Sequence, residues 1–425
     1  GGSAASFDED GEPISGQYFG WGIAHEIGHD INQGAYAVAE ITNNYFSVLA
    51  QARDTNDSVR FKYRNVYDKV TSGTKGKASN VFTQLGMYWQ LHLAYDPGYN
   101  YKTYEDYNEQ LANLFFARVD TYARKTDKAP KAVSGGVDLT LSGGTDQVLM
   151  RLSCAAAEKN LLEFFERWGM TPDADTIKYA SQFSEEKRAI YYACDDARVY
   201  AKTHSGSSLS ADGKTEAVSG ETTSVINPNV ANQVNFTLGA TIPAEDVLGY
   251  EITRCMISGG KTEKQVVGFA TENTFTDTIA AINNRMVWYE VSVIDKYLNR
   301  SAAKVLEPLK IEHDGSLDKT FWTVSTTGLT VEGEIEETGS TSGNIIHDSE
   351  DTAQGNDETP KSREKLIDRD PDTIYEATAG TQAEILLEFN KTLTVTGFKY
   401  TAGSGMSAGA YEILLQNGDT WISVA

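Results

Sequence analysis

The sequence predicts a multidomain chain in which a mainly α-helical region is followed by β-sandwich modules. The chain has 425 residues, which is more than one hydrophobic core usually serves, so about two to four domains are expected. Apolar residues recur at every third or fourth position up to about His204, as in amphipathic helices, and alternate with polar residues from about Val225. Two polar stretches interrupt these patterns and mark domain boundaries.

The composition argues against several classes of protein. The 37 basic and 60 acidic residues give a formal net charge of −23, which disfavours binding to nucleic acids or anionic membranes because both require clustered Lys and Arg. The three cysteines are widely spaced and form no CxxC pair, so neither a disulfide framework nor a structural zinc ribbon is predicted. The sequence has no apolar run of about 18 residues, and no transmembrane segment is predicted.

The start of the sequence indicates a piece of a longer protein. The segment GGSAASFDEDGEP carries no initiator Met, and it lacks the basic start and apolar core of a signal peptide. We therefore expect any targeting segment to lie outside this sequence.

The helical region is expected over residues 1–204. Helical periodicity is clear in VFTQLGMYWQLHLAY (81–95), LLEFFERWGM (161–170) and SEEKRAIYYACDDARVYAK (184–202). Residues 205–224 are polar, rich in Gly and Ser and without periodicity, which is typical of a linker.

The β-sheet part is expected in two pieces. Strand-like alternation in VNFTLGA, YEITRCMI and VWYEVSVID predicts a β-sandwich over residues 225–312. Residues 313–360 are strongly acidic and rich in Gly, Ser and Thr, so we expect a linker or loop there. Alternation returns over residues 361–425, which predicts a second β module.

The clearest candidate site lies in GWGIAHEIGHDINQGAYAVAEITNN (residues 20–44). On a helix, His25 and His29 are one turn apart and project from the same face, so both imidazoles can reach one metal ion. Glu26 is rotated by about 100° from His25 and can hydrogen-bond a water on that ion without being a ligand. A hydrolytic zinc site commonly uses three protein ligands and leaves one position open. A third ligand must therefore come from elsewhere.

Glu40 is the predicted third ligand. We expect the first helix to end near Asn32 and a second helix, over residues 35–52, to turn back and present Glu40 to the first. Glu40 stands in an apolar stretch, where a buried carboxylate is costly unless a metal partners it. Asn44, one turn further on, is predicted to orient Glu40. The alternative, an ordinary helix that carries HExxH by chance, is weakened by this context.

This region resembles the peptidase M60 family, the enhancin-like gluzincins. The similarity lies in GIAHEIGH, in the following QG and EITNNY segments, and in QLGMYWQLHLAY and FFERWGM further on. It covers about residues 17–204 and implies a zincin-type catalytic region. It also implies that His25, His29 and Glu40 bind one catalytic Zn²⁺ and that Glu26 is the general base. Because the family domain has sequence before this motif, we expect its N-terminal part to be missing here.

Such a site predicts hydrolysis of peptide bonds. Zinc would activate a water molecule and polarise the carbonyl, while Glu26 would take the water's proton and pass it to the leaving amine. A second group must stabilise the oxyanion. The candidates for this group are Tyr36, His92, Tyr99, Tyr191 and Tyr192. For His92, which stands in an apolar helix, a packing role is favoured.

The two β regions resemble known modules. RMVWYEVSVIDKYLNRS (285–301) is similar to the penultimate strand and turn of a fibronectin type III module, and the similar region is residues 225–312. Residues 366–401 and 411–425 resemble a discoidin, or coagulation factor 5/8 type C, domain. We place this partial domain at residues 361–425, with a start near residue 326 as the alternative.

Together these resemblances imply a secreted or cell-surface bacterial zinc endopeptidase that cleaves O-glycosylated, mucin-type host glycoproteins. The discoidin-like module would bind carbohydrate, and its resemblance allows a structural Ca²⁺. Two alternatives stay open: a general protease indifferent to glycans, and a glycan-binding adhesin with an inactive peptidase fold. The intact set of His25, Glu26, His29 and Glu40 favours an enzyme. The oligomeric state is not predicted.

Overall fold

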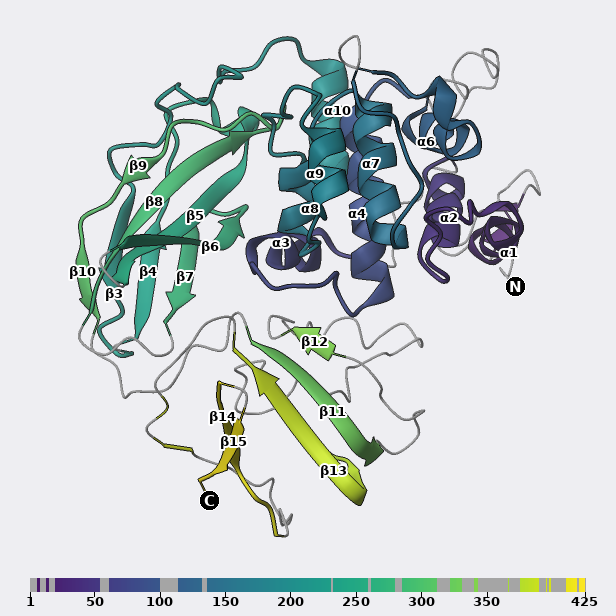
Figure 1. The fold of residues 1–425 in the computed structure, drawn as a ribbon. Helices are drawn as coiled ribbons and strands as arrows, with labels where there is room; N and C mark the ends of the chain where they lie inside the picture. The colour runs from purple at the N-terminus through teal and green to yellow at the C-terminus, as the bar shows by residue number, and fades with distance from the viewer. Residues whose placement is uncertain are drawn as a thin grey trace.

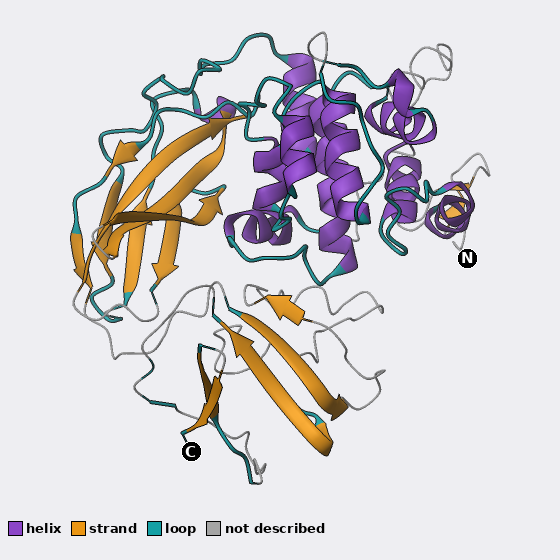
Figure 2. Cartoon of the chain, viewed as in Figure 1, coloured by secondary structure: helices purple, strands orange, loops and turns teal. Residues whose placement is uncertain are grey.

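A computed structural model shows the helices on one side of the molecule and the β-sheets beside and below them (Figure 1). Helices come first along the chain and strands dominate after them, in the order predicted (Figure 2). The structure describes residues 6–7, 13–14, 20–53, 61–99, 114–131, 136–230, 232–258, 261–279, 285–311, 322–330, 340–342, 366, 375–389, 395, 397–398, 410–418 and 420–424. Among the described helices, none combines the length and apolar character that crossing a bilayer requires.

The helical region follows a short antiparallel pair of strands, β1 (Ser6–Phe7) and β2 (Pro13–Ile14). Its α-helices are α1 (Trp21–Ile31), α2 (Thr42–Arg53), α3 (Tyr63–Thr71), α4 (Val81–Tyr95), α6 (Phe115–Arg124), α7 (Thr145–Ala157), α8 (Leu162–Arg167), α9 (Ala174–Ala180) and α10 (Asp195–Thr203). Two 3₁₀ turns, η1 (Thr126–Lys128) and η2 (Ile190–Tyr192), lie between them.

Helix α4 is the centre of this region. It is apolar on all sides, and every residue from Thr83 to Ala94 is buried, as expected of a helix surrounded by others. Asn80 caps its N-terminus, because the side-chain oxygen accepts from the backbone N–H groups of Phe82 (2.8 Å) and Thr83 (3.0 Å). The neighbours of α4 include α2, α3, α6 and α10. Helix α4 therefore supports α2, which lies next to the candidate site.

The second helix begins later than predicted. The first helix ends at Ile31, as expected, but α2 starts at Thr42 and not at residue 35. Glu40 has φ of 65°, a left-handed conformation that a right-handed helix cannot contain. The Thr42 hydroxyl fixes the preceding turn, because it donates to the Val38 carbonyl and accepts from the Val38 N–H, each at 3.0 Å.

Two antiparallel sheets follow the helices. One has the order β3 (Thr223–Ile226), β4 (Gln233–Thr237), β7 (Thr274–Thr278). The other has the order β10 (Leu309–Ile311), β8 (Arg285–Asp295), β5 (Val247–Ser258), β6 (Lys261–Ala270), with β9 (Lys304–Val305) paired to β8 and the 3₁₀ turn η3 (Ala244–Asp246) before β5. Side chains of both sheets, including Phe236, Ile252 and Val291, share one hydrophobic core.

The segment predicted as a linker, residues 205–224, is in contact with these sheets. Leu209 and Ala217 are buried in the core that the two sheets share. The Ser207 hydroxyl donates to the Asp295 carboxylate at the end of β8. Although its composition is polar, this segment is packed against the sheets, because its few apolar side chains lie in the core.

The last part of the chain contains strands in two further sheets. Strands β12 (Ser340–Ser342), β11 (Thr323–Thr330) and β13 (Thr378–Glu388) form one sheet in that order, and β14 (Leu414–Asn417) pairs with β15 (Thr420–Ser423). Most of the predicted acidic linker, and much of the predicted discoidin-like part, lie outside the described residues.

The helical region packs directly against the first pair of sheets. The Phe269 ring of β6 stacks on Tyr192 at a centroid distance of 3.8 Å, and it meets Tyr67 of α3 edge-on at 4.9 Å. The Ala189 N–H also donates to the Leu298 carbonyl (2.8 Å) in the turn after β8. These contacts hold the two parts in one fixed arrangement.

Lys69 of α3 predicts a pH dependence of stability. Its ammonium is buried and donates to two neutral groups of Thr74, the carbonyl (3.1 Å) and the hydroxyl (2.8 Å), and burial lowers the pKa of Lys69 to about 7. The unfolded chain keeps this proton to about pH 10. Below pH 7 Lys69 is charged in both states, so folding carries the full cost of burying the charge. Between pH 7 and pH 10 the unfolded chain keeps the proton that the folded protein has lost. The free energy of unfolding should therefore rise with pH in this range, by at most ~1.4 kcal/mol per pH unit.

Urea unfolding of Lys69→Met at pH 6 to 9.5 tests this expectation. The variant should be more stable than the wild type at pH 6, and its free energy of unfolding should rise less with pH. Lys77→Met is the matched control, because Lys77 is paired with Asp146 at 2.5 Å. Parallel pH profiles of wild type and Lys69→Met would contradict the expected effect.

Candidate metal centre

The structure brings together His25, His29 and Glu40, the three ligands predicted from the sequence. The two histidine Nε2 atoms are 3.2 Å apart. Glu40 Oε2 lies 3.4 Å from His25 Nε2, and Glu40 Oε1 lies 3.2 Å from His29 Nε2. In the described part of the chain, this is the one group of His, Cys, Asp or Glu side chains found close enough to share an ion.

These distances fit a tetrahedral metal ion. Zinc binds histidine nitrogen and carboxylate oxygen at about 2.0–2.1 Å, so two ligand atoms of a regular tetrahedron are about 3.3–3.4 Å apart. The three observed separations, 3.2, 3.2 and 3.4 Å, are close to this value. The distances to Glu40 run to its two different carboxylate oxygens, and one ligand atom chosen from each side chain lies within 4.8 Å of the other two. The three side chains can therefore share one ion, with a fourth position left for water or substrate.

Asn44 fixes the tautomer of His25. The Asn44 side-chain oxygen is 2.7 Å from His25 Nδ1, and because an amide oxygen only accepts, the proton must be on Nδ1. The Nε2 lone pair of His25 is then directed at the cluster, as a metal ligand requires. The Asn44 amide nitrogen donates to the Glu40 backbone carbonyl at 2.5 Å. Asn44 thus acts on the Glu40 backbone and on His25, whereas the sequence predicted an effect on Glu40 alone.

Asn43 is a site residue that sequence reasoning missed. It is fully buried, and its amide nitrogen lies 3.1 Å from both His29 Nε2 and His25 Nδ1. Because His25 Nδ1 carries a proton, the Asn43 amide can donate only to His29 Nε2. That nitrogen has one lone pair, so this hydrogen bond has to be released when His29 Nε2 binds an ion. The available signal was the first Asn in EITNNY, which stands directly before the predicted Asn44.

Glu40 is more exposed than predicted. Its side chain is 56 % exposed, against 35 % for His29 and 20 % for His25. The reason is that Glu40 lies in the turn before α2, at the rim of the α1–α2 pair, and not inside a helix. The argument that a buried Glu40 needs a metal is therefore wrong, although the predicted ligand is in place. The exposure leaves the cluster open to a large substrate.

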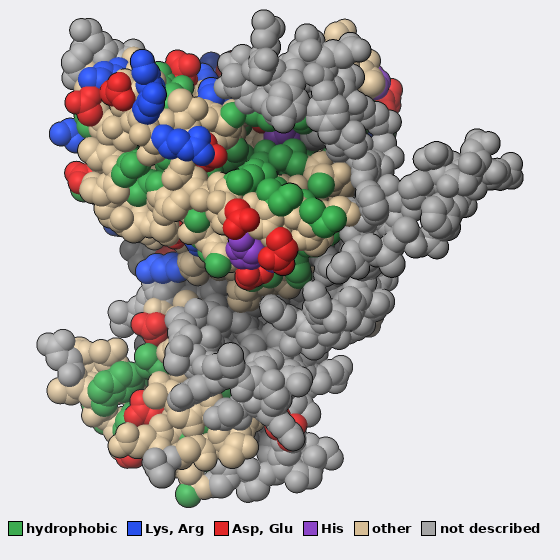
Figure 3. All heavy atoms as spheres, turned by 90° about the vertical axis from the view of Figure 1, so that its right-hand side faces the viewer, with side chains coloured by type: hydrophobic (Ala, Val, Ile, Leu, Met, Phe, Trp, Pro, Cys, Tyr) green, Lys and Arg blue, Asp and Glu red, His purple; other side chains and the backbone are tan. Residues whose placement is uncertain are grey.

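Glu26 lies beside the cluster and outside it. Its side chain is exposed on α1, one residue after His25, and it is not among the three clustered side chains. The face formed by α1 and α2 shows a histidine among acidic side chains, with hydrophobic side chains nearby (Figure 3). The exposed hydrophobic residues of α1 are Ile23, Ile27 and Ile31. A free carboxylate next to the two histidines can exchange protons with bound water.

Most of the predicted oxyanion-stabilising candidates have other partners. Tyr36 is buried and donates to Asp120 (2.7 Å). His92 is fully buried in α4, as predicted, and its Nδ1 lies 2.8 Å from Asp96 Oδ2. Tyr99 packs edge-on against His92 at a centroid distance of 6.0 Å.

The remaining two candidates are buried far from α1 in the fold. The Tyr191 hydroxyl donates to Glu163 of α8 (2.9 Å), and the Tyr192 hydroxyl donates to Glu251 of β5 (2.7 Å). Both therefore belong to the junction of the helical region with the sheets. The residue that stabilises the oxyanion is not identified among these tyrosines.

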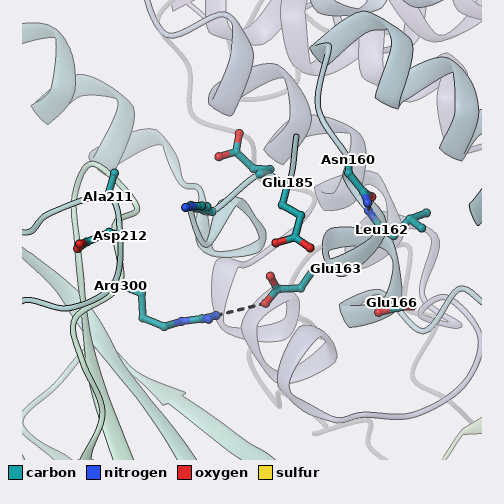
Figure 4. Close-up of a pocket in the computed structure, with 11 residues that line it drawn as sticks. Asn160, Leu162, Glu163, Glu166, Glu185, Ala211, Asp212 and Arg300 are labelled. Atoms are coloured by element: carbon teal, nitrogen blue, oxygen red, sulfur yellow. Dashed lines mark hydrogen bonds and ion pairs between the residues drawn. The ribbon is translucent and has the colours of Figure 1, made fainter. Parts of the chain in front are cut away.

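A cavity of about 450 Å³ lies at this junction, apart from the cluster. Figure 4 shows Arg300 reaching across it toward Glu163 of α8, at 3.4 Å. Glu185 and Asp212 also line it, and none of the predicted ligands does. Burial and the nearby Glu163 raise the pKa of Glu166 at its edge. The cavity is therefore separate from the candidate metal centre.

Two histidines from one helix and a glutamate from the following turn form the arrangement expected of a metallopeptidase of the HExxH type. Residues 14–169 match the model of the family described as peptidase M60, enhancin and enhancin-like. This match confirms the resemblance to the M60 family that the sequence shows. The assignment supports a peptidase that uses a metal. No curated protein matches the chain.

Several solved structures are similar to the chain. The M60 catalytic domain of ZmpC from Clostridium perfringens, in complex with the sialyl T antigen, is 22 % identical with a TM-score of 0.45, and the match covers 68 % of this chain and 50 % of that one. The ZmpB metallopeptidase from Clostridium perfringens is 21 % identical with a TM-score of 0.43, and the match covers 68 % and 49 %. An Fn3-like protein from Clostridium thermocellum is 18 % identical with a TM-score of 0.18, and the match covers 24 % and 97 %. The chain thus spans about half the length of the ZmpC and ZmpB chains.

Proposed function

We propose that the protein is a zinc metalloendopeptidase in which His25, His29 and Glu40 bind the ion and Glu26 is the general base. The observation that carries this proposal is the clustering of the two histidine Nε2 atoms, 3.2 Å apart, with the Glu40 carboxylate, whose oxygens lie 3.4 Å from His25 and 3.2 Å from His29. The three residues lie within the segment that matches the M60 family. The exposed side chain of Glu40 and the exposed Glu26 give a polypeptide substrate access to the site.

In the proposed mechanism, zinc supplies Lewis-acid activation of a water molecule and of the scissile carbonyl. Glu26 accepts the proton of the attacking water and then delivers it to the leaving amine, so one carboxylate serves as base and then as acid. Asn44 keeps the proton of His25 on Nδ1 and so reserves Nε2 for the ion.

We further propose that the substrates are O-glycosylated, mucin-type glycoproteins, and that the protein acts outside the cell. This rests on the M60 assignment, and ZmpC is an M60 catalytic domain solved with the sialyl T antigen. Carbohydrate binding by a discoidin-like module, a fibronectin type III-like module and a structural Ca²⁺ stay predictions. A glycan-independent protease and an inactive adhesin are the alternatives.

Digestion of a mucin-type glycoprotein, before and after enzymatic removal of its O-glycans, tests the proposal. Mass spectrometry of the products should place the cut bonds next to glycosylated Ser or Thr, with cleavage lost after deglycosylation. Equal cleavage of both forms would leave a general protease and remove the glycan requirement. Absence of cleavage by protein that carries stoichiometric zinc would favour the adhesin.

A further inference from the structure

Gly28 is the point of closest approach between α1 and α2. It is buried between the two helices, one residue before the second candidate ligand. A Cβ atom at this position would lie 2.4 Å from the Asn43 carbonyl oxygen and 3.0 Å from the Asn43 carbonyl carbon and Cα. The obstacle is backbone and cannot rotate away as a side chain can. No residue with a side chain fits without moving one helix from the other.

The site depends on this approach because its parts come from both sides of it. Helix α1 supplies His25 and His29, whereas Glu40, Asn43 and Asn44 belong to α2 and the turn before it. The hydrogen bonds of both asparagines to the histidine rings cross this interface. The two distances that involve Glu40 are therefore distances between the two helical segments.

Helix α1 is supported mainly by α2, apart from its buried Trp21 ring, which meets Phe82 of α4 edge-on at a centroid distance of 6.4 Å. Among the described elements, its extensive contacts are with α2, and on its other side Ile23 and Ile27 are 71 % and 51 % exposed. One further bond ties the two helices, from the Ser47 hydroxyl to the Trp21 carbonyl (3.1 Å). A displacement at Gly28 would therefore move the histidines relative to Glu40, because α2 is the main support of α1 among the described elements.

We propose that Gly28 is a positioning residue for the metal site, which rests on the proposed role of the three ligands. Its missing side chain lets the Asn43 backbone lie against α1, and this contact sets the histidine–glutamate spacing. An ordinary contact begins at 3.4 Å, and a Cβ on Gly28 would lie 2.4 Å from the Asn43 carbonyl oxygen. The two backbones would therefore have to move apart by about 1 Å. Metal–ligand distances tolerate only about ±0.2 Å, so such a shift is larger than the site can absorb.

Gly28→Ala and Gly22→Ala form a matched pair that tests this role. Gly22 lies on the same helix, and a Cβ there would meet nothing within 4 Å. Both variants add one methyl group to α1, and only the first adds it at the helix crossing. Zinc affinity would be measured by competition with a chelating dye, and the coordination of Co²⁺-substituted protein by its visible absorption spectrum.

Gly28→Ala should bind zinc about 10–100-fold more weakly, as loss of support around metal ligands usually does, and its Co²⁺ spectrum should change. Gly22→Ala should match the wild type in both measurements. Wild-type affinity and spectrum in Gly28→Ala, or an equal loss in Gly22→Ala, would overturn the inference. A wild-type protein that binds no zinc would contradict the proposed function. A wild type that binds zinc together with an unaffected Gly28→Ala would contradict only the role of Gly28.

Ser47→Ala is the second variant, in case Gly28→Ala does not fold. It removes the bond to the Trp21 carbonyl and adds no atoms, so it loosens the same crossing without a clash. Zinc affinity should fall about threefold, a smaller loss than that of Gly28→Ala because the Gly28–Asn43 contact remains. Unchanged zinc affinity in Ser47→Ala would overturn the role of the crossing even without a folded Gly28→Ala protein.

Discussion

Replacing Glu26 by glutamine is expected to slow peptide-bond hydrolysis by about 10²–10⁴-fold, the usual contribution of a positioned general acid–base group. Glutamine keeps the size of the side chain but cannot take a proton. The carboxylate of Glu26 is outside the group of ligand atoms, so zinc binding should stay at the wild-type level. The measurements are kcat/KM on a defined glycopeptide and zinc content by elemental analysis.

Asp30→Asn is the matched control for Glu26→Gln. Asp30 is the other exposed acid of α1 and lies one turn after Glu26, so this variant also removes one negative charge from the same helix. Its hydrolysis rate should stay within a few-fold of the wild type. A Glu26→Gln protein that holds zinc and cleaves as fast as the wild type would rule out Glu26 as the base.

The proximity of the three proposed ligands could be predicted from sequence because it depends mainly on local spacing. The spacing of His25 and His29 follows from one turn of helix, and Glu40 is the carboxylate that the next segment offers. The conformation of Glu40 could not be predicted, because the apolar stretch around it favours a helix. What places Glu40 in a left-handed turn is the way α2 packs on α1 and α4, which depends on contacts distant in sequence.

The surroundings of the site were harder to predict than its ligands. Asn43 contacts both histidines only because α1 and α2 cross at Gly28, and a crossing point is not encoded in any one segment. The tyrosine candidates failed for a related reason. Burial at the junction with the sheets is a tertiary property, and it removes Tyr191 and Tyr192 from the site. Segment 205–224 likewise shows its packing only when the sheets it contacts are known.

The second large effect is expected at Glu251 of β5, which joins the sheets to the helical region. Its buried carboxylate accepts from Arg167 of α8 (3.1 Å) and from the Tyr192 hydroxyl (2.7 Å), and it lies 3.6 Å from Arg300. Burial alone would raise the pKa of Glu251, but Arg167 and Arg300 outweigh it and hold the pKa below its ordinary value. The carboxylate is therefore charged at neutral pH and neutralises two arginines at the junction.

Glu251→Ala should lower the free energy of unfolding by about 3–5 kcal/mol, because it leaves Arg167 largely buried without its closest carboxylate. Glu290→Ala is the control from the neighbouring strand. Glu290, whose side chain is 19 % exposed, pairs with the 54 % exposed Lys264 at 2.6 Å. Because water reaches the lysine, the pair should contribute only about 1 kcal/mol. Urea unfolding followed by circular dichroism measures both. Equal losses in the two variants would show that the junction gains nothing from the buried pair.

The same carboxylate predicts how acid weakens the protein. Because the pKa of Glu251 is lowered by folding, its contribution is complete above the unfolded value of about 4.3 and is lost as the pH falls through the lower folded value. Wild-type stability should therefore drop more steeply from pH 5 to pH 3 than that of Glu251→Gln, which has no proton to gain there. Since Arg167 and Arg300 reach Glu251 from both sides of the junction, the loss should loosen the packing of Phe269 on Tyr192. Near-ultraviolet circular dichroism along the acid titration would report that change, and identical acid transitions in the two proteins would exclude Glu251 as its cause.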